Sequence, residues 1–389
     1  MLWQLIICRC LNEVVEHDPS FRDIFRDLGI LQTLLQIVLQ SYAKSHDLAV
    51  PENEGGVNAV KAGKDHVNIL MIESLAVIVK GHKQNARIVR EQGLPCFLQL
   101  VWNDTLHSSS LRLIGHISRS GTDEDTEACI AGLCEMLQSD PCDKIHQRLL
   151  TSDVLSTLTT MVENSAIGKN AIRVFGGFKI LIDIFIRLKD HFVLGGDDNQ
   201  NELTGDDVDL DVESTGINLQ LFTEKHAAKL FQEAISLLSV STVNNLVNYK
   251  YVWSDIGTAG LAHAVACTNI FRSRFCNAAL NSMAGLAIGA RVFDIFSLPA
   301  ALFDEEPADE YLPWITQDDN DSLSFSAGMH FLGRQRWSAE PLLLLINLSG
   351  CMCLLKAQRL LTLLTRIASS RPDHAQVNPL AKIEFFFIR

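Results

Sequence analysis

The sequence predicts an all-α fold, in which amphipathic helices stack into a helical solenoid. Apolar residues recur at helical spacing along most of the chain. Hydrophobic residues make up 47% of the sequence but aromatic residues only 7%, so aliphatic side chains form the core, as suits packed helices. Three stretches also repeat one pattern, which is the sequence signature of a repeat architecture. In each stretch a short amphipathic helix ends at a glycine and a second apolar helix follows: Gly29, Gly93 and Gly177.

The first expected unit is a set of three helices. Residues 2–17 place their apolar side chains on one helical face. Ser20 follows Pro19 and is expected to cap the short helix after it by accepting a backbone N–H. That short helix ends near Gly29, because glycine tolerates the left-handed conformation after a helix. A longer helix is expected over 30–43.

The later elements repeat this pattern with interruptions. A polar, glycine-rich loop is expected over 45–64 and a third glycine-centred copy over 168–188. The helices expected between them span 66–81, 84–92, 94–103, 108–119, 123–139 and 143–163. After the third copy, helices are expected over 221–247 and 257–290.

An acidic segment divides the expected domains. Eight carboxylates and no Lys or Arg fall within residues 195–216, which favours a disordered insert. The ending KIEFFFIR leaves three apolar rings without later partners, which favours truncation of a longer chain. The expected organisation is an array over 1–194, the insert over 195–218, a continued array over 219–296, a loop-rich segment over 297–340, and C-terminal helices over 341–389.

The charge and the cysteines of the chain indicate which ligands and which cellular compartment to expect. A net charge of −13 argues against non-specific nucleic-acid binding, which needs a basic surface. Ten cysteines lie mostly in apolar helical stretches and show no secreted disulfide framework, which favours a reducing compartment. The N-terminus lacks the features of a signal peptide. We therefore expect a cytoplasmic protein, peripheral to endomembranes at most through a larger assembly.

The glycine-centred copies resemble armadillo repeats, in which a glycine turn precedes a long third helix with a hydrophobic pattern. That pattern is present here as Gly29-Ile30 with Leu34, Gly93-Leu94 with Phe97 and Leu98, and Gly177-Phe178 with Leu181. The copies lie 64 and 84 positions apart, whereas the family repeat is about forty residues. The resemblance implies an irregular armadillo/HEAT-like, right-handed solenoid with loop insertions.

The irregular spacing and the acidic insert resemble the helical N-terminal regions of giant BEACH-domain proteins. These include the neurobeachin type and the WD-repeat-and-FYVE autophagy adaptors, and the resemblance covers residues 1–290. It implies a non-catalytic protein-interaction scaffold in membrane trafficking or autophagy, with protein partners. No BEACH, FYVE or WD40 signature is visible in the sequence itself.

Patterns that would indicate chemistry are weak. Asp207, Asp209 and Asp211 alternate as in an EF-hand loop, but Val212 stands where that loop requires glycine. Cys8 and Cys10 are too close together for a zinc pair, and core packing explains them better. No phosphate loop, nucleophile elbow or metalloprotease motif occurs. We expect no catalytic residue, no cofactor and no metal site.

A basic cluster is the best candidate for partner binding. Lys80, His82, Lys83, Arg87 and Arg90 lie within eleven positions around an expected helix–turn–helix. They would line a positive groove for an acidic peptide or a phosphoinositide headgroup, while the alternative is an ordinary solvated face. We select Lys83, Arg87 and Arg90 as the candidate binding residues.

Two alternative functions remain open. An armadillo-type nuclear-transport or adhesion adaptor would carry recurring Asn and Trp on its third helices. Here those helices carry Gln32, Gln36, Trp102 and Asp183, which weighs against that class. An enzyme regulatory subunit or an unrecognised enzyme is the alternative from another class, and a deep pocket with converging His, Asp or Cys would favour it.

Overall fold

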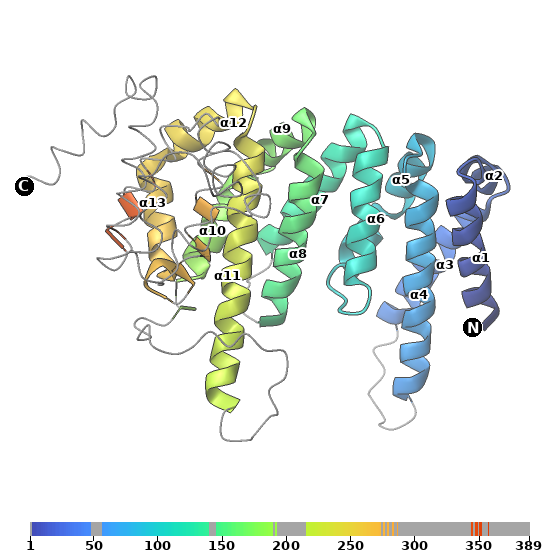
Figure 1. Ribbon diagram of the computed structural model, residues 1–389. Helices are drawn as coiled ribbons and strands as arrows, with labels where there is room; N and C mark the ends of the chain where they lie inside the picture. Colours follow the sequence, from blue (N-terminus) through green and yellow to red (C-terminus); the bar gives the residue numbers. More distant parts are fainter. Residues whose placement is uncertain are drawn as a thin grey trace, which may run out of the picture. The chain divides into compact units, whose positions relative to one another are not determined.

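In a computed structural model of the chain, every regular element of the described residues is a helix, which confirms the all-α class (Figure 1). The structure describes residues 2–47, 57–139, 145–189, 191–192 and 215–273, with isolated positions between 275 and 357. No helix in these ranges is long and apolar enough to cross a membrane.

Several predicted segments lie outside the described residues. These are the acidic insert up to residue 214, the loop-rich segment 297–340, and nearly all of the C-terminal helices 341–389. Residues 215–218, predicted as the end of the insert, are instead the first residues of a helix.

The helices follow one another through short connections, most of them where the sequence predicts them. Their bounds are α1 Leu2–His17, α2 Phe21–Asp27, α3 Ile30–Asp47, α4 Val57–Val79, α5 Lys83–Leu100, α6 His107–Ser120, α7 Asp123–Ser139, α8 Ile145–Val162, α9 Ala166–Val174, α10 Gly177–Arg187, α11 Thr215–Thr242, α12 Leu246–Lys250 and α13 Thr258–Cys267. A π-helix, Tyr251–Gly257, joins α12 to α13, and a 3₁₀ turn follows at Ile270–Arg272.

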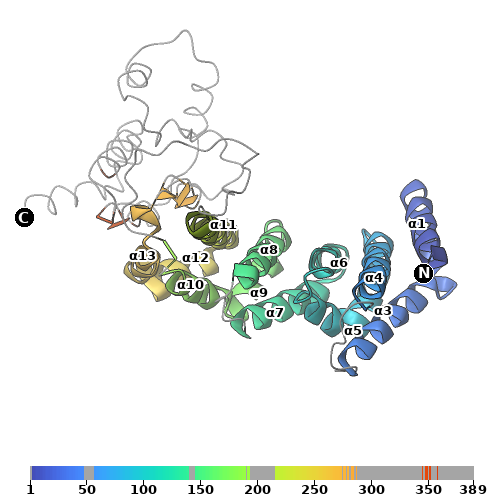
Figure 2. The ribbon, with the colours of Figure 1, turned by 90° about the horizontal axis from the view of Figure 1, so that it is seen from below.

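The chain divides into two compact units, of which the first contains residues 1–141 and 149–177. Its helices form two layers (Figure 2). In one layer α1 packs on α4 and α4 packs on α6, while in the other α3, α5, α7 and α9 pack in that order. Contacts such as those of α5 with α6 join the layers. Neighbour-to-neighbour packing is what stacked repeats produce, whereas the right-handed sense of a solenoid stays a prediction.

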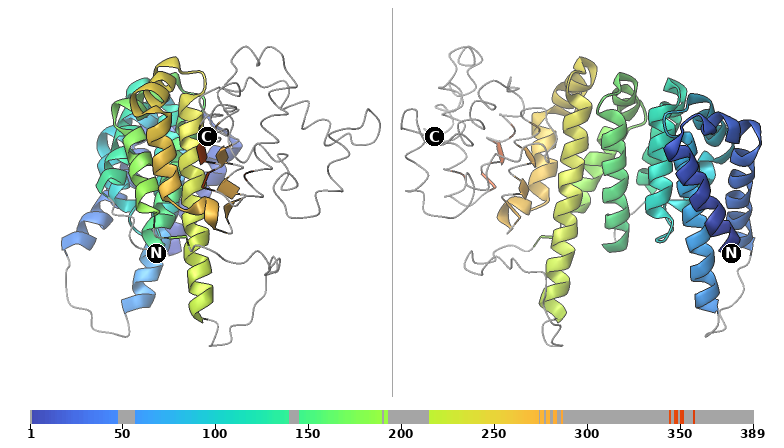
Figure 3. Two further views of the ribbon diagram at one scale, coloured as in Figure 1. Left: turned by 90° about the vertical axis from the view of Figure 1, so that its left-hand side faces the viewer. Right: turned by 45° about the vertical axis from the view of Figure 1, so that its right-hand side comes forward.

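The second unit contains residues 142–148 and the described residues from 178 onward. Aromatic rings form much of its core. The ring of Phe231 in α11 lies 5.4 Å from that of Phe185 in α10 and 6.5 Å from that of Phe271 after α13. All three rings are buried, so α11, the long yellow-green helix in Figure 3, packs on both of these elements.

The clearest repetition is in the turns that follow α4, α6, α8 and α11. Each turn has Gly or Asn, then a residue that caps the next helix. Gly81 and Gly121 are 40 positions apart, Gly121 and Asn164 are 43 apart, and Asn164 and Asn244 are 80 apart. These spacings are about one or two times forty residues, the period of armadillo and HEAT repeats. The glycine-centred copies do not show the repeat period of about forty residues, but these capped turns do.

The four turns also share a hydrogen bond. The cap side chain accepts the backbone N–H of the residue three positions later, which we call the cap-plus-three residue. That residue is buried in all four turns. The capping pairs are His82 with Asn85 at 3.2 Å, Thr122 with Asp125 at 3.3 Å, Ser165 with Gly168 at 2.9 Å and Asn245 with Asn248 at 3.0 Å.

The predicted glycine turns are correct at one position of three. Gly29 has a φ of +75° between α2 and α3, as expected. Gly93 does not end a helix, because α5 continues through it and through Pro95. The turn before α10 is made by Gly176, with a φ of +74°, and Gly177 is already helical. The sequence prediction also missed Gly257, whose φ is +79° at the start of α13.

Packing explains why Gly93 is a glycine. A Cβ placed there would lie 2.6 Å from Phe97 Cε2 and 2.8 Å from Leu35 Cδ1, closer than carbon atoms can approach. Gly93 therefore lets α5 approach α3. Between Gly93 and the third copy the chain adds the helix pair α6 and α7, which has no short helix between its members. This extra pair accounts for much of the 84-residue distance between Gly93 and Gly177.

Two local predictions were also wrong. Ser20 makes no side-chain capping bond, and its backbone N–H donates to the Asp18 carboxylate at 2.9 Å instead. Asp18 can accept that bond because Pro19 turns the chain back between them. Helix α4 begins at Val57, inside the expected loop 45–64, because its apolar face against α1 and α6 outweighs the polar local sequence.

Candidate partner-binding surface

The start of α5 is fixed by a histidine cap. The Nδ1 atom of His82 accepts the backbone N–H of Asn85, so its Nε2 atom carries the proton and donates to Asp23 Oδ1 at 2.9 Å. The buried Asn85 amide donates to the carbonyl oxygens of Arg22 and Ile78 at 3.1 and 3.2 Å. These bonds tie α5 to α2 and to the end of α4, so the surface that α5 presents is rigid.

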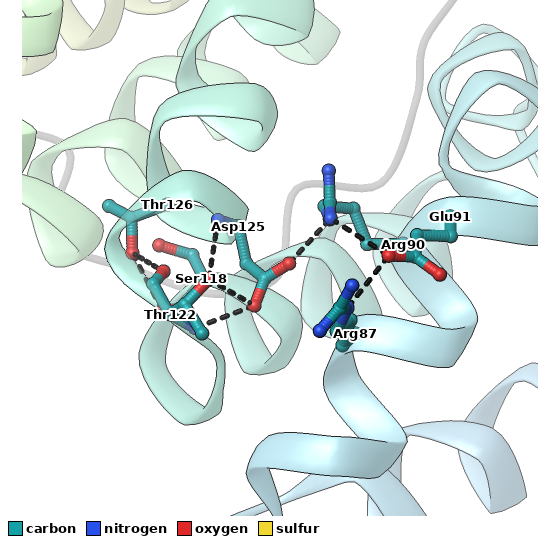
Figure 4. A network of polar contacts seen from close by, with 7 residues as sticks. All are labelled: Arg87, Arg90, Glu91, Ser118, Thr122, Asp125 and Thr126. Carbon is teal, nitrogen blue, oxygen red and sulfur yellow. Dashed lines mark hydrogen bonds and ion pairs between the residues drawn. The ribbon is translucent and has the colours of Figure 1, made fainter.

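The three predicted binding residues have different surroundings, and Figure 4 shows two of them, Arg87 and Arg90. Lys83 is exposed at the first position of α5. Arg87 is 64% exposed, and its Nε donates to Glu91 Oε1 at 2.8 Å. Arg90 is only 21% exposed and forms an ion pair with Asp125 of α7. The structure thus leaves Lys83 and Arg87 available on the surface, and their role in binding stays a prediction.

Arg90 serves a structural purpose in the junction between α5 and α7. The Asp125 side chain is fully buried. Its Oδ2 atom accepts the backbone N–H of Thr122 at 2.6 Å and the Thr122 hydroxyl at 2.8 Å. Next to it, the Thr126 hydroxyl donates to the Ser118 carbonyl oxygen at 2.9 Å. A buried carboxylate requires a counter-charge, and Arg90 supplies it from the neighbouring helix (Figure 4).

The structure forms a second basic cluster that the sequence prediction did not assemble. Arg112, His116 and Arg119 lie on one face of α6, at the i, i+4 and i+7 spacing of a helix. Arg119 donates to His116 Nδ1 at 3.4 Å. The backbone N–H of Gly81 donates to Ser120 Oγ at 2.7 Å, which brings Lys80 beside the end of α6. We call Lys80, Arg112, His116 and Arg119 the α4–α6 basic patch.

The electrostatics of the α4–α6 basic patch are uniformly positive. The pKa of His116 is lowered to about 4, mainly by burial and also by the charges of Arg119, Arg112 and Lys80. Every charge that shifts this pKa is therefore a cation. Lys80, Arg112 and Arg119 are exposed, and among the described residues none of them forms an ion pair.

The missed residues had a signal in the sequence. Lys80 was grouped with the α5 cations because they are close along the chain, yet the fold places it beside α6. The spacing of Arg112, His116 and Arg119 was readable on a predicted helix. What the sequence could not show is that α4 and α6 pack together and that their ends meet.

The described part of the chain was also compared with the metal sites considered from the sequence. There, no group of three His, Cys, Asp or Glu side chains could hold a metal ion. Cys8 is buried whereas Cys10 is exposed, so the two thiols point to different surroundings, as expected. The Asp207 run lies outside the described residues.

The described residues thus define an all-α protein, whose neighbouring helices pack on one another in the first unit. The sequence matches no known family model. It is 24% identical over 186 residues to the human WD repeat- and FYVE domain-containing protein 4. It is also 25% identical over 195 residues to the mouse protein of that name. The match covers 48% of this chain but only 6% of each relative, so the chain corresponds to a small part of their length. This similarity agrees in part with the predicted resemblance.

Proposed function

We propose that this chain is a non-catalytic scaffold that binds protein partners along its helical surface. The observation that supports this most directly is the repeated helical unit. Capped turns recur at about forty residues, and in the first unit each helix packs on its neighbours in two layers. Such arrays present extended surfaces that suit peptide or helix binding.

The setting that we propose is membrane trafficking or autophagy. The two similar proteins are named for a WD repeat and a FYVE domain. The predicted resemblance to BEACH-domain proteins, including the neurobeachin type, points to the same setting. Association with endomembranes would then be indirect, through partners or through a larger assembly, and the chain would act in the cytoplasm.

Proximity labelling in cells tests this proposal. The 389-residue chain would be fused to a labelling enzyme and compared with the enzyme alone. We expect enrichment of trafficking or autophagy proteins. Enrichment of importins or cadherin tails would instead favour the nuclear-transport or adhesion adaptor, and one enzyme recovered in stoichiometric amount would favour a regulatory subunit. Labelling no different from the control would contradict the scaffold.

A matched variant tests the predicted binding residues in the same experiment. Lys83→Gln with Arg87→Gln removes two exposed charges and leaves the Arg90–Asp125 pair intact. If α5 contacts partners, this variant should lose a defined subset of the enriched proteins. An unchanged set would show that the α5 surface is not the one used.

A further inference from the structure

We propose that the α4–α6 basic patch binds an acidic peptide segment of a partner protein. This inference rests on the proposed scaffold function and gives it a location and a ligand chemistry. The patch consists of Lys80, Arg112, His116 and Arg119, which come from the end of α4 and from one face of α6.

The patch stands out because its charge opposes that of the chain. The net charge is −13, so the chain as a whole repels an acidic ligand. Several other cations near these helices already have carboxylate partners: Arg26 pairs with Asp23 and Asp27, Arg87 with Glu91, and Arg90 with Asp125. The exposed cations of the patch have no such partner among the described residues. An acidic ligand can therefore reach three neighbouring cations here without displacing an internal carboxylate, whereas Lys83 at the start of α5 offers a single such cation.

The length of the patch suits a chain of carboxylates. Arg112 and Arg119 are seven residues apart on α6, which corresponds to about 10 Å along the helix axis. A peptide in the polyproline II conformation has three residues per turn and advances about 3.1 Å per residue, so carboxylates three residues apart lie on one side and can meet both guanidinium groups. Arginine binds carboxylates with two parallel hydrogen bonds, which adds direction to the attraction. A single phosphate group would occupy only one part of this surface.

The patch is also held in place before any ligand arrives. The bond from Gly81 to Ser120 fixes the α4–α5 turn against the end of α6. The Nδ1 atom of His116 accepts from Arg119, so the neutral imidazole keeps its proton on Nε2 as a further donor. Bringing carboxylates to this surface would relieve the repulsion among its cations, the same repulsion that helps to lower the pKa of His116.

An acidic peptide fits better than a membrane surface. Membrane-binding basic surfaces combine cations with exposed apolar side chains that enter the lipid. In the described residues, the exposed large hydrophobic side chains lie on elements other than α4 and α6. The patch therefore offers charge without an apolar anchor.

Fluorescence anisotropy with the full 389-residue chain tests the inference. The probe is a fluorescein-labelled peptide with six Glu residues separated by pairs of Ser residues, so that carboxylates recur every three residues. Arg112→Gln with Arg119→Gln should weaken binding about tenfold, which is reasonable for two exposed charges acting together. Lys225→Gln with Lys229→Gln removes the same charge from the exposed face of α11 and should change affinity less than about twofold. Lys80→Gln is a second patch variant, in case the double variant folds poorly.

A nuclear magnetic resonance titration of His116 gives a second readout. The bound peptide should raise its pKa, because carboxylates offset the nearby cations. Equal weakening by the two double variants, or an unmoved His116 titration, would overturn the assignment to this patch. Patch-dependent binding to phosphoinositide vesicles without peptide binding would overturn it in favour of a lipid. None of these outcomes affects the proximity-labelling result, so the two proposals fail separately.

Discussion

At the residue scale, Asp125 has the most demanding environment. Its carboxylate is fully buried, and its counter-charge comes from Arg90, which is 35 positions earlier in the chain. The carboxylate also lies in the first turn of α7, where the helix N-terminus favours negative charge. These interactions offset the cost of removing the carboxylate from water, and loss of Arg90 would leave it unpaired.

The first prediction concerns this pair. Arg90→Ala should lower the free energy of unfolding by about 3 kcal/mol, because it leaves a buried charge without its partner. Urea unfolding measures this loss. In a double-mutant cycle with Asp125→Asn, the second change should cost much less in the Arg90→Ala background than alone. Additive losses would show that the pair contributes no coupling.

The second prediction concerns His116 and pH. Its pKa is about 4 in the folded chain and 6.5 in the unfolded chain. Between these values the unfolded chain holds more protons, so stability falls as the pH falls from 6.5 towards 4. Each pKa unit corresponds to about 1.4 kcal/mol. Because the imidazole is only half-buried, solvent screening reduces the expected total to about 1–2 kcal/mol.

The measurement compares urea unfolding of the wild type and His116→Gln at several pH values. The variant lacks the titrating group, so its stability relative to the wild type should increase as the pH falls through this window. All other titratable groups are common to the two proteins, so their contributions cancel in the comparison. A constant difference between the two proteins would contradict the lowered pKa.

Individual residues were predictable only where local sequence decides their environment. Lys83 and Arg87 lie exposed at the start of α5, on the side that a helical pattern predicts as polar. Arg90 is on the same helix, yet its role depends on a carboxylate from α7. The grouping of Lys80 with α6 likewise depends on how two helices pack. Neither the Arg90–Asp125 ion pair nor the position of Lys80 beside α6 can be predicted from the neighbouring sequence.

At the scale of elements, glycines serve two purposes that sequence alone does not separate. Gly29 has a positive φ and open space around the position of a Cβ. Gly93 has helical backbone but no space for a Cβ beside Phe97 and Leu35. One glycine is required by backbone conformation and the other by packing.

The third prediction separates these purposes. Gly29→Ala should cost about 1 kcal/mol through backbone strain, and Gly29→Asn less, because Asn tolerates the left-handed region. Gly93→Ala should cost about 1–2 kcal/mol, since overpacking outweighs the gain in helix propensity. Chemical denaturation gives all three values. A stabilising Gly93→Ala would show that α3 and α5 can move apart without loss.

Helix positions were largely predictable, because apolar periodicity and turn residues are local. The bounds of α1, α6 and α7 agree with the sequence prediction to within one residue. The break at Gly93 was wrong because Gly93 and Pro95 suggest a helix end, whereas packing on α3 and α6 keeps α5 continuous. The early start of α4 has the same cause. Tertiary contacts overrode local preference in both places.

At the scale of the whole molecule, the fourth prediction tests the boundary placed at the acidic insert. A fragment of residues 1–194 contains every residue of the first unit and also α10. Repeat arrays are stabilised mainly by contacts between neighbouring helices. We therefore expect this fragment to be helical by circular dichroism and to unfold cooperatively in urea. If the fragment stays unfolded while the complete chain folds, a domain boundary at residue 195 is wrong.

The capped turns have a practical consequence for recognising such chains. The five-residue segments are GHKQN from Gly81, GTDED from Gly121, NSAIG from Asn164 and NNLVN from Asn244. Each combines a turn former, a helix cap and a small or polar residue that is buried three positions after the cap. Hydrophobic periodicity rarely marks a buried polar position, so this combination is a more selective search pattern than glycine followed by an apolar residue. Applied to much longer proteins, it would count helical units where insertions have obscured their period.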